Sequence, residues 1–132
     1  MRRDTPVRTG ESRRHSELAG RRAETFAVWI LRAKGYAILH RRYATRFGEI
    51  DIIARRGRLL VFVEVKRRRR LEDALQALDP RQCERIGRAA QAYVKRFPAT
   101  ECLDLRFDLV AVAGLRFTHL QDAFRPSSGR GA

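Results

Sequence analysis

Two short apolar segments in the middle of the chain carry charged side chains two residues apart. The first holds Glu49 and Asp51, and the second holds Glu64 and Lys66. Both segments are typical of β-strands, and Gly57 between them predicts a tight hairpin turn. Side chains two apart share one face of a strand, so three carboxylates and one ammonium meet if the two polar faces coincide. Burying them among apolar residues requires a compensating charge, most simply a divalent cation, as in metal-dependent nuclease sites.

A solvated strand face is the competing explanation. Charged side chains on the exposed face of a half-buried hairpin are ordinary, and Glu49 and Lys66 would then form a cross-strand ion pair. Alternation alone does not separate the two explanations. The segment from Leu59 to Val65 is almost unbroken apolar, as in a central strand covered on both faces, and this favours the metal site. Lys66 is also one of few lysines in an arginine-rich chain, which indicates that this position requires a compact ammonium rather than a planar guanidinium.

Length and composition limit the class of protein. The chain has 132 residues, 44% of them hydrophobic, which is enough for one compact domain. Its formal net charge of +14 suits a polyanion, with nucleic acid first and an anionic membrane second. Cys83 and Cys102 lack the spacing of metal ligands, so a reduced cytoplasmic protein is expected. No apolar run approaches ~18 residues, so no membrane span is predicted.

The chain divides into a basic arm, one folded domain and a tail. Residues 1–17 are Arg-rich without periodicity and predict a disordered arm, 18–124 form the domain, and 125–132 predict a disordered tail. Apolar spacing and breakers predict helices over 18–34, 71–78 and 79–97, and strands over 36–43, 48–54, 59–66, 104–113 and 115–120. The order α-β-β-β-α-β-β predicts an α/β fold in which helices pack on a mixed sheet.

A helix with Glu24, a strand with Asp51 and a strand with Glu64-x-Lys66 resemble the PD-(D/E)xK nuclease superfamily. The chain is more closely similar to the YraN-like family of small bacterial proteins, which have a Holliday-junction-resolvase-like endonuclease fold. The matching motifs are Gly20 with Ala23-Glu24, Gly35-Tyr36, Ile38-Leu39, Gly48-Glu49-Ile50-Asp51, Phe62-Val63-Glu64-Val65-Lys66-Arg67 and Arg106-Phe107-Asp108. The resemblance spans about residues 18–120 and implies a restriction-endonuclease-like mixed sheet flanked by helices.

The chemistry expected of these residues is metal-assisted hydrolysis of a phosphodiester. Asp51 and Glu64 would bind Mg²⁺ or Mn²⁺, and the backbone carbonyl of Val65 would add a ligand. Glu24 would reach the metal from its helix, as an outer ligand or as a holder of water. Lys66 would position or help to deprotonate the attacking water and would offset charge in the transition state.

Further residues have supporting or open roles. Glu49 is either another ligand or the partner of an arginine at the start of its strand. Gln82 stands where the family commonly has a Lys-Gln step, and it would substitute beside the metal. Asp108 shares a strand face with Arg106, which predicts an ion pair that supports the site. The four arginines that directly follow Lys66 are expected to contact phosphates: Arg67, Arg68, Arg69 and Arg70.

Two functions follow from these observations. The first is a metal-dependent nuclease that hydrolyses phosphodiester bonds in DNA, of a branched or damaged form. The second is a non-catalytic nucleic-acid-binding protein that keeps the nuclease fold. Carboxylates beside a polyanion favour the first, since they need a metal to neutralise them. DNA is the expected partner and a membrane is not, because no helix pairs a basic face with a large aromatic one. A homodimer is implied by the resemblance alone.

Overall fold

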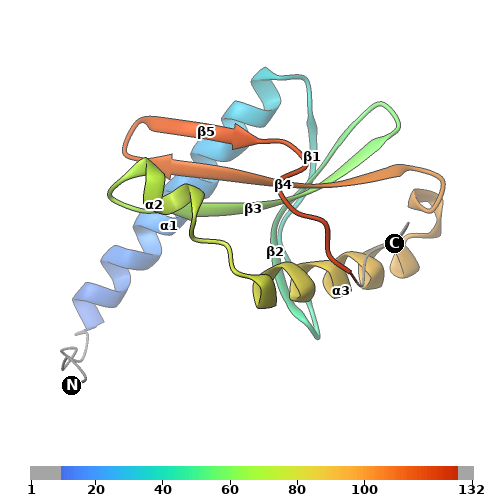
Figure 1. Ribbon diagram of the computed structural model, residues 1–132, viewed down its shortest axis with the longest axis horizontal. Coiled ribbons are helices and arrows are strands. Elements are labelled where there is room, and N and C mark those ends of the chain that lie inside the picture. Colours follow the sequence, from blue (N-terminus) through green and yellow to red (C-terminus); the bar gives the residue numbers. More distant parts are fainter. Residues whose placement is uncertain (1–9, 128–132) are drawn as a thin grey trace.

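A five-stranded sheet in the order β1-β2-β3-β4-β5 forms the centre of the structure, a computed structural model that describes residues 10–127 (Figure 1). In chain order the elements are α1 (Gly10–Ala33), β1 (Ala37–Thr45), β2 (Gly48–Arg56), β3 (Leu59–Arg67), α2 (Leu71–Leu75), α3 (Pro80–Arg96), the 3-10 turn η1 (Pro98–Thr100), β4 (Asp104–Ala113) and β5 (Arg116–Leu120). β3 and β4 are parallel, and the other neighbours are antiparallel. The mixed α/β fold and the predicted element order are confirmed.

Helices cover both faces of the sheet. One apolar cluster joins α1 to side chains such as Ile52, Val61 and Val63, and a second joins α3 to Ile53 and Phe62. Neighbouring residues of β2 and β3 thus point into different cores, as expected for central strands buried on both faces. The hairpin between β2 and β3 turns at Gly57, whose φ of 62° fits the first central position of a two-residue turn.

Helix α1 begins at Gly10 rather than at the predicted Leu18. Its first turns extend beyond the sheet (Figure 1), and Arg14, Glu17 and Leu18 are exposed. A helical segment whose described side chains are largely exposed needs no apolar periodicity, which is why the sequence pattern missed it. The helix ends where predicted, because Gly35 has a φ of 92° and the next amide, that of Tyr36, bonds back to the carbonyl of Leu31.

The predicted ends of the domain differ from the structure where they can be compared. Residues 1–9 and 128–132 lie outside the described range. Within it, the segment after Arg125 is docked: Pro126 is buried, and Ser127 bonds to Glu84 of α3 through both its amide and its hydroxyl. Residues 126 and 127 therefore do not belong to a disordered tail. Among residues 10–127, none of the helices combines the length and apolar character that crossing a bilayer requires.

Strand β1 lies at one edge of the sheet and is irregular. Its pairing with β2 shifts register between Ile38 and His40, which is a β-bulge. A few residues later Arg42 has a φ of 50°, a left-handed conformation that is unfavourable for a side chain of this size. Both irregularities lie in the part of β1 that faces the centre of β2.

Candidate metal centre

The sheet forks between β2 and β3. β2 and β3 pair with each other from Arg56–Leu59 to Ile52–Val63. Beyond that point β2 pairs only with β1, and β3 pairs only with β4. Figure 1 shows β2 turning away from β3. At the fork the amide of Val65 donates to Oδ2 of Asp51 at 2.8 Å, so a side chain replaces the missing backbone acceptor.

The same contact gives the direction of the Val65 carbonyl. In a β-strand the N–H and C=O of one residue point to the same side. Because the Val65 amide points at Asp51, its carbonyl points into the fork as well. A carboxylate and a carbonyl oxygen from neighbouring strands are therefore directed into one space.

Strand alternation is interrupted beside this space. Ile50 belongs to the core under α3, whereas Ile52 belongs to the core under α1, although they are two residues apart. In the register, Asp51 lies opposite the left-handed Arg42. Glu49 is exposed and is not among the residues that line the cavity at the fork. The alternation breaks between Asp51 and Ile52, so it does not separate Glu49 from Asp51, and the role of Glu49 as a ligand or as the partner of an arginine stays a prediction.

A cavity of about 340 Å³ lies at the fork and brings the four predicted catalytic residues together. Glu24 comes from α1, Asp51 from β2, and Glu64 and Lys66 from β3. The carboxylate of Glu64 is almost fully buried, and its Oε2 lies 3.3 Å from Nζ of Lys66. The other lining residues are Ser16, Gly20, Ala23, Val65, Arg67 and Arg68.

Arg42 completes the polar surroundings of the cavity. Its Nε donates to Oε1 of Glu24 at 2.7 Å. That hydrogen bond, together with the charge of Glu24, raises the pKa of Arg42 above its ordinary value. Sequence reasoning missed Arg42, because nothing in the sequence distinguishes it from the many other arginines.

The electrostatics at Asp51 are unfavourable without a cation. Burial, followed by the charge of Glu64, raises the pKa of Asp51 to about 8. The Val65 N–H opposes this rise, and the charge of Glu24 adds to it. Two carboxyl groups that share a buried position cannot both ionise readily. A proton on Asp51, or a cation close to it, would relieve this repulsion.

These donors fit a hard divalent cation. Mg²⁺ is usually held in proteins by one or two carboxylates and keeps several waters. Asp51, Glu64 and the Val65 carbonyl match that requirement. Within the described range there is no group of three or more His, Cys, Asp or Glu side chains placed to hold a metal ion. A site of this kind therefore relies on two carboxylates, a carbonyl, water and substrate oxygens.

Of the remaining predicted site residues, some line the cavity and others lie away from it. Gln82 forms a capping box with Asp79 at the start of α3, in which its side chain accepts from the Asp79 amide. It does not line the cavity. Of the four consecutive arginines, Arg67 and Arg68 line the cavity, whereas Arg70 pairs with Glu72 at 3.4 Å. Arg69 is exposed.

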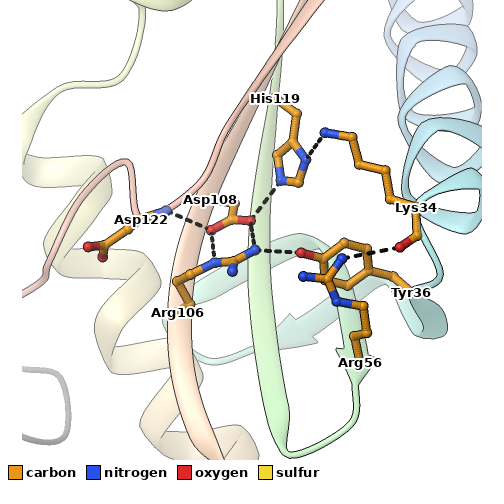
Figure 2. Close-up of polar contacts among 7 residues, drawn as sticks. All are labelled: Lys34, Tyr36, Arg56, Arg106, Asp108, His119 and Asp122. Atoms are coloured by element: carbon orange, nitrogen blue, oxygen red, sulfur yellow. Dashed lines mark hydrogen bonds and ion pairs between the residues drawn. The ribbon is translucent and has the colours of Figure 1, made fainter.

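Asp108 lies in a separate buried network, shown in Figure 2. Both of its oxygens accept from Arg106, at 2.8 and 2.7 Å, so the predicted pair with Arg106 is present. The Asp122 amide and Nε2 of His119 also donate to it, at 2.9 and 2.7 Å. Arg106 in turn donates to the hydroxyl of Tyr36 at 2.7 Å, which links β4 to the end of α1.

The partners of His119 define its tautomer. Nζ of Lys34 lies 2.9 Å from Nδ1, and an ammonium can only donate. Nδ1 is therefore the acceptor, and Nε2 carries the proton that is donated to Asp108. His119 is neutral in this arrangement, and Arg106 supplies the positive charge that balances Asp108.

Replacing Asp51 by asparagine is expected to stabilise the metal-free protein at alkaline pH by about 1–3 kcal/mol. A carboxyl group whose pKa is raised on folding contributes stability below its unfolded pKa and loses it as pH rises through the folded value. The wild type should therefore weaken between about pH 4 and pH 8, and Asp51→Asn should not. Urea unfolding across this range measures the difference. Equal pH dependence in both proteins would contradict the electrostatic description.

Comparisons with known proteins agree on one family. The profile described as "Uncharacterised protein family UPF0102" matches residues 23–112. A UPF0102 protein of Parvibaculum lavamentivorans is 51% identical over 108 residues, which is 81% of each chain. One of Nitrobacter winogradskyi is 50% identical over 83% of this chain and 94% of its own. UPF0102 protein mlr4633 of Mesorhizobium japonicum is 47% identical over 89% of this chain and 94% of its own.

Proposed function

The chain belongs to the uncharacterised protein family UPF0102, and from its cavity we propose that it is a metal-dependent nuclease that hydrolyses phosphodiester bonds in DNA. One observation carries the proposal: Asp51 and Glu64 lie together in a buried fork of the sheet, with the Lys66 ammonium 3.3 Å from Glu64. A purely structural role does not explain why Asp51 is buried beside Glu64, where burial and the charge of Glu64 raise the pKa of Asp51. A buried acid perturbed by a specific charged neighbour in a cleft is typical of a functional site.

In this proposal Asp51, Glu64 and the Val65 carbonyl hold Mg²⁺ or Mn²⁺. The bound ion would polarise the phosphodiester and make water a better nucleophile. Lys66 orients the attacking water or takes part in its deprotonation, and its charge offsets the negative charge that develops on the phosphate. Glu24, which is held by Arg42, orients water from the α1 side of the cavity.

The charge of the molecule supports a nucleic-acid substrate. The formal net charge is +14, and Arg67 and Arg68 lie on the wall of the cavity itself. Guanidinium groups at that position suit the phosphates beside the bond that is cut. Both cysteines are free thiols, and we place the protein in the cytoplasm, where DNA and reduced thiols occur together.

We expect cleavage of end-labelled DNA with Mg²⁺ or Mn²⁺ and none with EDTA. A panel of four-way junction, flap, single-stranded and duplex substrates, separated on denaturing gels, gives both activity and structural preference. A higher rate on junctions or flaps would support branched DNA as the substrate. Undiminished cleavage in EDTA would contradict the mechanism. Metal-independent binding of DNA without cleavage of any substrate would instead support the non-catalytic nucleic-acid-binding function.

A further inference from the structure

A second hollow lies on the other side of β2 from the metal centre. It is a groove of about 470 Å³ between the start of α3 and the turn that joins β1 to β2. Its lining residues are Phe47, Pro80, Arg81, Glu84, Arg85 and Arg88. Neither the carboxylate cluster nor the four arginines after Lys66 contribute to it.

Three of these lining residues form a basic stripe on α3. Arg81, Arg85 and Arg88 recur at helical spacing, so they project from the same side of the helix. The opposite side of α3, which includes Ile86 and Tyr93, is buried against the sheet. The stripe therefore faces outward as a row of cations along one wall of a groove.

Arg85 is fixed in the groove by the backbone of β2. Its Nη1 donates to the carbonyl of Glu49 at 3.2 Å. A side chain on Gly48 would collide with this guanidinium, so the glycine both adopts a φ of 120° and leaves space for the arginine. One cation of the stripe is therefore held in place, while Arg81 and Arg88 are exposed.

The one acidic residue of the groove is already engaged. Both oxygens of Glu84 accept hydrogen bonds from Ser127, from the amide at 2.8 Å and from the hydroxyl at 2.6 Å. Its ability to repel an anion is reduced by these donors. On the opposite wall Phe47 lines the groove, and the guanidinium of Arg46 lies 4.9 Å from its ring centre, so this wall combines an aromatic ring with a further cation.

We propose that this groove binds a single-stranded segment of nucleic acid, with phosphates on Arg81, Arg85 and Arg88 and a base or sugar against Phe47. An aromatic ring that is open to a groove can stack on a base that has left its own stack, which favours a single strand over a duplex. The inference rests on the proposed function and extends it. Arg85 contacts the backbone of Glu49, two residues from Asp51 in β2, so the groove and the metal centre flank the same stretch of β2 from its two sides.

The test compares two double variants that remove equal charge. Arg81→Gln/Arg88→Gln removes the exposed part of the stripe and keeps Arg85, whereas Arg55→Gln/Arg58→Gln removes two exposed arginines at the opposite end of β2. Binding of a fluorescent single-stranded oligonucleotide and of its duplex is measured by anisotropy in EDTA over a range of salt. The groove variant should reduce the single-strand log–log salt slope by about 1.4, from about 0.7 per phosphate contact. The control variant should leave that slope unchanged.

A third variant tests the aromatic wall. Phe47→Leu keeps an apolar side chain in the partly buried position and removes the ring. We expect it to weaken single-strand binding roughly fivefold or more and to leave duplex binding within about twofold. Circular dichroism and urea unfolding show whether each variant is folded as the wild type is.

The outcomes separate this inference from the nuclease proposal. Equal losses of single-strand binding in the groove and control variants would contradict the proposed binding site. A loss of binding confined to duplex DNA would contradict it as well. Selective loss of single-strand binding supports the groove even if no metal produces cleavage, because the measurement involves no catalysis. If the protein cleaves DNA in a metal-dependent way but the groove variant binds single strands as the wild type does, the nuclease proposal stands and the proposed single-strand site is wrong.

Discussion

Lys66→Ala is expected to lower the rate of DNA cleavage by about 10²–10³-fold. The ammonium lies 3.3 Å from Glu64 and lines the same cavity as Asp51, so it is placed to act on water or on the phosphate. Affinity for DNA should change only about threefold, because a single phosphate contact is a small part of the attraction of a chain with a net charge of +14. Single-turnover cleavage and anisotropy measure the two effects separately.

Two further variants and one control complete this prediction. Asp51→Asn and Glu64→Gln keep the shape of the cavity and remove one metal-binding charge each, and cleavage should fall by at least about 10²-fold. Lys95→Ala removes an exposed lysine from the last turn of α3 and should leave the rate unchanged. Full activity of Glu64→Gln would rule out the proposed metal centre, even if the protein remained a nuclease.

Asp108→Asn is expected to destabilise the protein by about 3–5 kcal/mol. Asp108 is fully buried, and the substitution would leave the largely buried Arg106 without its counter-charge. The new amide group would also face donors from His119 and from the Asp122 backbone with too few acceptors. Urea unfolding at neutral pH measures the loss. Asp104→Asn, an exposed residue at the start of the same strand, is the control and should change stability by less than about 0.5 kcal/mol.

The effect of Asp108 should depend on pH in a defined direction. Burial alone would raise the pKa of Asp108, but hydrogen bonds from His119, Arg106 and the Asp122 amide outweigh it and lower that pKa. A lowered carboxyl pKa contributes stability above the unfolded value of about 3.9 and loses it as pH falls through the folded value. The difference in unfolding free energy between wild type and Asp108→Asn should therefore be largest at neutral pH and should shrink below about pH 4. A difference independent of pH would indicate altered packing instead.

The sequence predicted the elements whose signals are local. Alternation and Gly57 gave the β2–β3 hairpin, Gly35 gave the end of α1, and Asp79-Pro80 gave the start of α3. Because β2 and β3 form the fork, strand alternation also indicated that Asp51, Glu64 and Lys66 would meet, whereas Glu24 was placed with them only by the resemblance to the nuclease superfamily. Each of those predictions uses residues that are close in the chain, where capping and turn chemistry decide the structure.

The rest depended on contacts that spacing does not encode. Arg42 has a left-handed backbone in β1 and donates to Glu24 of α1, 18 residues away in the chain, and no spacing rule predicts that contact. Glu49 was grouped with Asp51 by alternation, but it is exposed and does not line the cavity, which spacing along a strand does not indicate. Gln82 is different, since an aspartate followed three residues later by a glutamine is a capping-box signal that the sequence does contain.

The irregular edge strand has a consequence for the behaviour of the protein at high concentration. A regular edge strand offers a row of free amides and carbonyls to which a strand of another molecule can add. The bulge after Ile38 and the left-handed Arg42 break that row in β1, and the adjacent Arg41 adds charge to it. The left-handed conformation of Arg42, which contacts Glu24, thus also makes β1 a poor template for intermolecular β-sheet formation. It therefore opposes aggregation through this edge of the sheet.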